Sequence, residues 1–294
     1  MPLPGRFLTS MLIRRDGDLF LFDCGEGTQV SLKMLSLKWK KINAIFISHM
    51  HADHVTGLPG MLMLSSQVDR TDPLYIFGPD RLKEYVEQTR RILDMYINYE
   101  IVVIPVKEGV VMEDEEFTIE AFRLDHTKLC YGYSLVEKKR KGEFYPGKAI
   151  EYGVPKGPMW GILQHGGSVV LENGLTVTPD MVMGRERAGR KISYVTDTLY
   201  FPEIADYVHD SDVLFCEGMF EDALEESARE KKHMTARQAA MIARDGGCSR
   251  LMLQHYSPRY SKDELKVLER EAKEIFPATI LTKDRMSFEI PLKE

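Results

Sequence analysis

One short motif constrains this chain more than any other part of it: Ser48-His49-Met50-His51-Ala52-Asp53-His54. It directly follows the apolar run Ala44–Ile47, which indicates a buried strand, so the motif lies in a loop before a helix expected from about Val55. Alternate residues of an extended loop share a face, and His49 and His51 should therefore point to the same side. Asp53 and His54 are adjacent and must diverge, which allows them to serve a second ion.

Metal binding accounts for this concentration of side chains better than a structural role does. A lone histidine on an apolar face is usually a satisfied core residue. Three histidines and one aspartate within six positions do not fit that role, because burying them without partners would cost several kcal/mol. Imidazole and carboxylate are common ligands of protein-bound zinc. The motif therefore predicts a metalloenzyme.

The bulk properties indicate a soluble cytoplasmic protein with no membrane partner. The chain has 294 residues, 44% of them hydrophobic, and can bury a large core in one or two domains. No stretch approaches the roughly 20 apolar residues of a membrane span, and none resembles a signal peptide. Its cysteines are far apart, which favours reduced, buried thiols; they are Cys24, Cys130, Cys216 and Cys248. The net charge of −6 argues against nonspecific coating of nucleic acid but allows a local basic patch.

Alternating strand and helix signals predict an α/β protein. Strands are expected at 11–14, 19–23, 44–47, 74–77, 101–105, 117–124, 131–136, 193–196, 213–216, 251–253, 278–281 and 287–290. The three strands between 101 and 136 are expected to form an antiparallel section. Helices are expected at 26–37, from 55, at 79–96, shortly after 196, and at 221–230, 235–245 and 261–274.

The segment from Glu137 to about Gly189 breaks this pattern, because it is rich in glycine, proline and basic residues. It shows no clear core periodicity, and a segment of this length is usually either functional or a floppy surface insertion. Basic residues outnumber acidic ones before Trp160; they are Lys138, Lys139, Arg140, Lys141, Lys148 and Lys156. Composition alone leaves both interpretations open.

Further potential ligands follow predicted strands, where open α/β sheets place their sites. They are His126, Asp197 and His255, and each alone could equally be a cap. Together they complete two ligand sets that share Asp197 as a bridge. The sets are His49, His51, His126 and Asp197, and Asp53, His54, His255 and Asp197. Nitrogen and oxygen ligands without thiolate favour two zinc ions per subunit, with manganese or iron as alternatives.

His233 is expected to act as a general acid, because both ligand sets are complete without it. It precedes a helix that Thr235 could cap. Glu217, at the end of a predicted strand, could orient the His233 imidazole and raise its pKa. We therefore expect Asp53, His233 and Glu217 to be the catalytic residues.

The net charge expected at the metal site favours one class of reaction over others. Two dications set against Asp53, Asp197 and a hydroxide leave about one net positive charge, which attracts an anion. Hydrolysis of a phosphodiester is favoured on this ground, while hydrolysis of a lactone, thioester or lactam stays possible.

The chain resembles the ribonuclease Z family of the metallo-β-lactamase superfamily over nearly its whole length. Phe22–Gln29 resembles the family's first motif, and Asp23 would support the metal site from behind the ligands. Ser48–His54 matches the superfamily motif, which glyoxalase II-like and lactonase-like members share, and His126, Asp197 and His255 fall where the family places its other ligands. Two stretches, His233–Ala236 and Gln254–Tyr260, resemble motifs of ribonuclease Z itself. The second adds Arg259 as an expected RNA contact.

The resemblance implies an αββα four-layer sandwich formed by residues 1–294 as a single domain, with 137–189 inserted as a flexible tRNA-binding arm. Gly153–Pro158 resembles the Gly-Pro motif of that arm, so Gly157 and Pro158 join its basic residues as expected RNA contacts. A homodimer is also implied, in which each arm serves the partner's active site. The family usually begins with a strand carrying Leu-Gly-Thr-Gly, which Met1–Arg6 lacks, so we expect one sheet to have a bare edge.

The implied activity is that of a zinc-dependent endoribonuclease that removes the 3′ trailer of precursor tRNA and leaves a 3′-hydroxyl. The alternatives are a small-molecule hydrolase of the same fold and a non-catalytic RNA-binding protein. The basic arm argues against the first alternative, because a small substrate does not need it. The complete set of ligand residues argues against the second.

Overall fold

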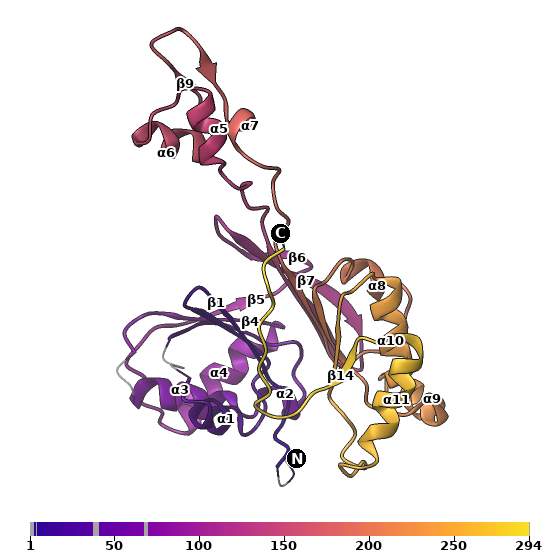
Figure 1. Ribbon diagram of the computed structural model, residues 1–294. Coiled ribbons are helices and arrows are strands. Elements are labelled where there is room, and N and C mark those ends of the chain that lie inside the picture. Colours follow the sequence, from indigo (N-terminus) through magenta and orange to yellow (C-terminus); the bar gives the residue numbers. More distant parts are fainter. Residues whose placement is uncertain (1–2, 4, 38–40, 68–69, 294) are drawn as a thin grey trace. The chain divides into compact units, whose positions relative to one another are not determined.

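The structure is a computed structural model that describes residues 3, 5–37, 41–67 and 70–293. The chain divides into two compact units (Figure 1). The first comprises Met1–Glu113, Thr118–Val136 and Lys191–Ile290, and the second Asp114–Phe117, Glu137–Arg190 and Pro291–Glu294. Within the described ranges, no helix is long and apolar enough to span a membrane.

A five-stranded sheet in the order β1-β2-β3-β4-β5 forms one half of the first unit. Its strands are β1 (Met11–Arg15), β2 (Asp18–Phe22), β3 (Ile42–Phe46), β4 (Leu74–Gly78) and β5 (Ile101–Pro105). β1 and β2 form the predicted antiparallel hairpin, and β1 is an edge strand among the described residues. β5 was wrongly expected in an antiparallel section. It lies parallel to β4, because the intervening helix α4 (Arg81–Ile92) carries the chain back across the sheet.

A seven-stranded sheet in the order β14-β13-β12-β11-β8-β7-β6 forms the other half. Its strands are β6 (Gly109–Glu113), β7 (Phe117–Asp125), β8 (Leu129–Glu137), β11 (Lys191–Val195), β12 (Val213–Glu217), β13 (Leu251–Gln254) and β14 (Thr279–Leu281). β11 to β14 are parallel, whereas β8 joins β11 antiparallel. The predicted strand at 287–290 is absent. There Phe288 stacks against Phe215, so its ring packs without strand pairing.

Helices cover one face of each sheet (Figure 1). Beside the five-stranded sheet lie α1 (Thr28–Met34), α2 (Ala52–Val55), α3 (Leu58–Gln67) and α4. Beside the seven-stranded sheet lie α8 (Ile204–Tyr207), α9 (Glu225–Glu230) after the 3-10 turn η2 (Asp222–Leu224), α10 (Ala236–Asp245) and α11 (Leu265–Ile275). The helix expected from Val55 starts earlier, at Ala52, and is interrupted at Gly57. A side chain there would lie 2.1 Å from the Gly25 carbonyl oxygen, so only glycine fits.

Aromatic rings fill the space between the two sheets. Phe22 lies 5.9 Å from Tyr133 and 6.0 Å from Tyr194, measured between ring centroids, and Phe46 also contacts Tyr133. Separate aliphatic clusters pack each sheet against its helices. The predicted α/β class is confirmed, with two mixed sheets. All four cysteines are free and buried, as the sequence indicated.

The second unit has a core of its own, which the sequence did not reveal. It contains α5 (Pro146–Glu151), α6 (Pro158–Gln164), α7 (Pro179–Val182) and the hairpin of β9 (Val169–Val170) and β10 (Thr176–Val177). The buried residues of this core are Ala149, Val154, Leu163, Val169, Val177 and Val182. A backbone bridge between Arg140 and Arg187 pairs the two ends of the segment. Its elements are too short to show periodicity, which is why no core is recognisable in its sequence.

Candidate metal centre

The structure brings together all seven predicted ligands within the first unit. His49 and His51 lie in the loop after β3, and Asp53 and His54 lie in α2. The others follow strands of the seven-stranded sheet: His126 follows β7, Asp197 follows β11, and His255 follows β13. The ends of neighbouring strands thus converge on one site, as expected for an α/β fold.

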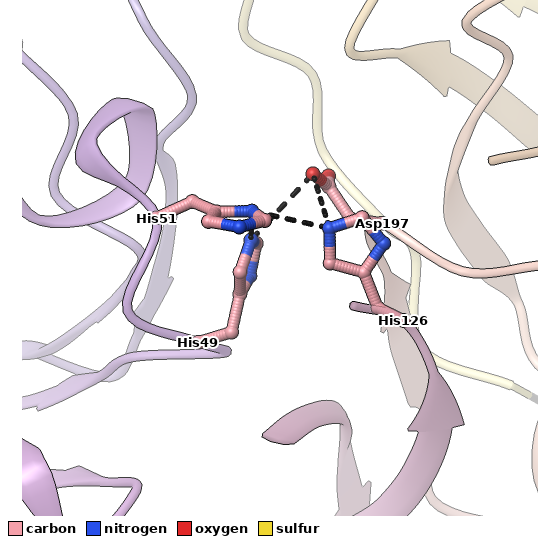
Figure 2. A group of neighbouring side chains, drawn as sticks. All are labelled: His49, His51, His126 and Asp197. Atoms are coloured by element: carbon pink, nitrogen blue, oxygen red, sulfur yellow. Dashed lines mark hydrogen bonds and ion pairs between the residues drawn. The ribbon is translucent and has the colours of Figure 1, made fainter. Parts of the chain in front are cut away.

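The first group consists of His49, His51, His126 and Asp197 (Figure 2). His51 Nδ1 lies 3.0 Å from His49 Nε2 and 3.1 Å from His126 Nε2. Asp197 Oδ2 lies 3.6 Å from His49 Nε2 and 3.7 Å from His126 Nε2. Ligand atoms bound tetrahedrally to zinc lie about 3.3 Å apart. The spacing of this group therefore fits a four-coordinate zinc ion.

The second group consists of Asp53, His54, Asp197 and His255. His255 Nε2 lies 3.2 Å from Asp53 Oδ2 and 3.3 Å from Asp197 Oδ1, and His54 Nε2 lies 3.4 Å from the same Asp197 oxygen. His54 Nε2 is buried without a hydrogen-bond partner, which is costly unless a cation binds there. Asp197 directs one carboxylate oxygen to each group, the arrangement expected of a bridging ligand.

The second ring nitrogen of four histidines contacts a supporting group, as is usual for metal-bound imidazoles. His54 Nδ1 lies 2.7 Å from Asp23 Oδ2, in agreement with the expected supporting position of Asp23. Three further supports are the Ser48 hydroxyl for His49 at 3.0 Å, the Thr127 hydroxyl for His51 at 3.4 Å, and the Lys232 carbonyl for His126 at 2.8 Å. Sequence reasoning missed these three. Ser48 was visible inside the motif, but no pattern marks Thr127 or a backbone carbonyl as a support.

The electrostatics differ between the ligands. Burial lowers the pKa of His54, but the Asp197 and Asp23 carboxylates outweigh it and raise that pKa, so a metal ion there would replace a proton. Burial, together with the neighbouring histidines, lowers the pKa of His49 to about 2, so its imidazole is neutral and can act as a ligand. Burial alone would raise the pKa of Asp197, but the charges of His255 and His54 hold it well below its usual range. Asp197 is therefore ionised, although it is only 2% exposed.

The partly buried His233 and the buried Glu217 form a pair beside the ligands. His233 Nδ1 lies 2.9 Å from Glu217 Oε2, and Glu217 Oε1 accepts a hydrogen bond from the Thr198 N–H at 2.6 Å. The His233 ring lies 5.1 Å from that of His126 and 5.7 Å from that of His255. Burial lowers the pKa of His233, but the charge and hydrogen bond of Glu217 outweigh it and raise the pKa to about 9. Glu217 thus favours the protonated form of the His233 imidazole.

The expected RNA contacts lie in both units. In the second unit, Lys138, Lys139, Lys141, Lys148, Lys156, Gly157 and Pro158 are exposed. Arg140 is partly buried and donates to the Lys293 carbonyl, which makes it less accessible than the sequence suggested. In the first unit, the exposed Arg259 guanidinium lies 5.0 Å from the ring centroid of Phe220, which itself contacts His233. Arg259 and His233 thus contact the same aromatic ring, that of Phe220.

Comparison with known proteins agrees with this site. The chain is 59% identical to ribonuclease Z of Treponema denticola over 295 residues, covering 100% of this chain and 96% of that protein. It is 41% identical to ribonuclease Z of Borreliella afzelii, covering 98% of this chain and 93% of the relative. The chain belongs to the ribonuclease Z family. It is accordingly a hydrolase of that family, with a metal-binding cluster of histidine and aspartate.

Structural and family-level matches support the same assignment. The crystal structure of human tRNase Z, short form, superimposes with a TM-score of 0.70 at 26% identity, covering 99% of this chain and 95% of that one. Residues 164–256 match the family described as beta-lactamase superfamily domain, and residues 5–145 match the family described as anti-Pycsar protein Apyc1. The ribonuclease Z chain therefore has the metallo-β-lactamase fold.

Proposed function

We propose that this protein is a zinc-dependent endoribonuclease that removes the 3′ trailer of precursor tRNA and leaves a 3′-hydroxyl. The observation that carries the proposal is the pair of ligand groups sharing Asp197, with His233 and Glu217 beside them. Membership of the ribonuclease Z family supports the choice of substrate.

Two metal ions per subunit would be held by this chain, with Asp197 shared between them. His49, His51 and His126 would complete one site, and Asp53, His54 and His255 the other. Zinc fits the nitrogen and oxygen donors best, and manganese or iron would also be accepted. When bound, two such ions supply an activated water and neutralise charge on the phosphate.

His233 would donate the proton that the leaving group needs. Water attacks the phosphorus, the bond from phosphorus to the ribose 3′ oxygen breaks, and the imidazolium gives its proton to that oxygen. Glu217 holds the imidazolium in place through Nδ1, which leaves Nε2 to act as the donor. Asp53, the more exposed carboxylate of the site at 38% of its side chain, would accept the proton that the attacking water loses.

The second unit would bind the tRNA away from the reacting phosphate, as the family's inserted arm. Its exposed lysines can hold backbone phosphates without reading sequence. Arg259, which contacts the same Phe220 ring as His233, would hold a further phosphate of the RNA. We further propose a homodimer, in which each arm serves the partner's active site.

Product mapping tests the proposal. The zinc-loaded protein is incubated with a 3′-extended tRNA, and both product ends are sequenced. A single cut just 3′ of the discriminator nucleotide, with a 3′-hydroxyl on the tRNA, is expected. Rapid hydrolysis of a small diester, thioester or lactone by a protein that leaves the tRNA intact would contradict it.

A further inference from the structure

The ligands come from two different sheets, so the distance between the sheets decides whether they meet. His49, His51, Asp53 and His54 follow β3 of the five-stranded sheet, whereas His126, Asp197 and His255 follow strands of the seven-stranded sheet. Each ligand group contains residues from both sheets. A small displacement between the sheets would therefore disturb both groups.

Several buried hydrogen bonds join the two sheets, and one of them lies directly behind the ligands. The Tyr194 hydroxyl donates to Asp23 Oδ2 at 2.7 Å. Tyr194 lies on β11, three residues before Asp197. Asp23 directly follows β2 and contacts His54 Nδ1. Each end of this hydrogen bond is thus connected to a ligand. Tyr194 is connected to Asp197 along the chain, and the Asp23 carboxylate contacts His54.

Asp23 depends on its donors to hold its position. Its Oδ2 receives the Tyr194 hydroxyl, the Ser48 hydroxyl at 2.8 Å and His54 Nδ1, while Oδ1 receives the Ser48 N–H at 2.7 Å. The side chain is 0% exposed, and its backbone φ of 56° lies in the left-handed region. A buried carboxylate without sufficient donors is strongly disfavoured. Of these donors, only Tyr194 comes from the opposite sheet.

We propose that Tyr194 is a positioning residue for the metal centre. Its hydroxyl fixes Asp23 against the seven-stranded sheet and thereby sets the orientation of His54 and the distance from His54 to Asp197. The proposal rests on metal binding at the site, a part of the proposed function that does not depend on the RNA substrate.

Tyr133 supplies a matched control. It is also fully buried between the sheets and packs on Phe22 as Tyr194 does. Its hydroxyl likewise crosses to the five-stranded sheet, where it donates to the Ile47 carbonyl at 2.8 Å. Tyr133→Phe and Tyr194→Phe therefore remove the same atom from similar surroundings. They differ in the acceptor, a backbone carbonyl in one case and the carboxylate that supports His54 in the other.

Zinc affinity is the measurement that tests the proposal. Metal-free wild type, Tyr194→Phe and Tyr133→Phe are titrated against a chromophoric chelator, and melting temperatures are recorded for the metal-free proteins. Loss of a group behind a ligand typically weakens metal binding by about 10–100-fold. Tyr194→Phe should lower the affinity for one of the two zinc ions by about that factor, whereas Tyr133→Phe should leave both zinc affinities unchanged. The cobalt absorption spectrum should change only for Tyr194→Phe.

Several outcomes would overturn the proposal. It fails if Tyr194→Phe binds two zinc ions as tightly as wild type, or if Tyr133→Phe shows the same loss. Asp23→Asn provides a second variant. Its side chain carries no buried charge for the Tyr194 hydroxyl to stabilise. Adding Tyr194→Phe to it should cause little further loss, and two independent, additive losses would show that Tyr194 does not act through Asp23. Failure to cleave tRNA, with zinc affinity still dependent on Tyr194, would contradict only the proposed function.

Discussion

At the scale of single residues, a substitution of His233 should affect proton transfer without affecting metal binding. Its Nδ1 is held by Glu217, and it belongs to neither ligand group that shares Asp197. We predict that His233→Ala keeps its metal and its tRNA affinity but loses turnover by about 10²–10⁴-fold, the usual contribution of a general acid. The loss should shrink on a nitrophenyl phosphodiester, whose leaving group needs no proton. Single-turnover rates on both substrates are the measurement.

Glu217→Gln is the control for this prediction, because it keeps the shape of the side chain and can still accept from the Thr198 N–H. It should show a smaller loss of turnover in the same direction. Glu217→Ala is less informative, since it would also leave the Thr198 N–H, next to Asp197, without its acceptor. If His233→Ala loses zinc, or slows both substrates equally, His233 is a ligand or a structural residue.

Asp197 carries a second prediction, because it directs an oxygen to each ligand group. Asp197→Ala should reduce the metal content well below two ions per subunit and abolish hydrolysis, since both sites lose a charged ligand. Elemental analysis of the dialysed protein measures the metal content. Two retained ions would contradict the bridging role. Asp263→Ala is a suitable control, because Asp263 is exposed and pairs with Lys266, and neither residue contacts a candidate ligand or its support.

The clustering of the candidate ligands was predictable because their chemistry is local. Three histidines and an aspartate in six positions are costly to bury together unless they bind a metal, and His126, Asp197 and His255 each follow a recognisable strand. The groups behind them were not predictable in the same way. Tyr194 resembles any apolar strand residue, and its role depends on Asp23 lying opposite in another sheet. Such a partner is fixed by packing, which a single sequence does not display.

At the scale of elements, the contribution of the N-terminal cap of α10 to stability can be tested. Thr235 accepts from the Gln238 N–H at 3.2 Å, and Gln238 in turn accepts from the Thr235 N–H at 3.0 Å. Thr235→Ala removes this N-terminal cap and should lower the free energy of unfolding by about 1 kcal/mol. Chemical denaturation measures the change. Thr176→Ala, at an exposed position of β10, should have a much smaller effect. Equal effects would show that the cap contributes little.

Elements with long, regular patterns were predicted well, and the errors have physical causes. The periodicity of α10 and α11 and the cap at Thr235 were recognisable in the sequence. The orientation of β5 was wrong because a strand's own residues do not state which neighbour it pairs with. The strand expected at 287–290 was wrong because alternation can also be satisfied by a single ring contact, here between Phe288 and Phe215.

At the scale of the whole molecule, the two units suggest a division of labour. The first unit holds all the candidate ligands together with His233 and Glu217. The second has its own buried core and carries all the exposed lysines expected to contact RNA. Binding energy from a remote contact can accelerate a large substrate without affecting a small one. Removing the second unit should therefore slow the cleavage of a large RNA substrate and leave the hydrolysis of a small substrate unchanged.

The backbone bridge between Arg140 and Arg187 shows where to make that deletion. Each residue's N–H donates to the other's carbonyl, at 2.8 and 2.9 Å, so a short glycine turn can join them directly in place of residues 141–186. We predict that this variant loses at least about tenfold in kcat/KM on precursor tRNA and stays close to wild type on a nitrophenyl phosphodiester. Equal losses on both substrates would show that the segment is structural.

Salt dependence distinguishes lost phosphate contacts from lost folding in the same variant. Lysines that hold phosphates release counterions, so the tRNA affinity of the wild type should fall steeply as salt rises. The deletion should flatten that slope, because the exposed Lys141, Lys148 and Lys156 are removed with the segment. A full-length variant with Lys141, Lys148 and Lys156 changed to glutamine is the matched control, because the deletion removes these same exposed lysines. It should reproduce both the lower affinity and the flatter slope while keeping the buried core of the unit. An unchanged slope in that variant would assign the arm's contribution to shape rather than to charge.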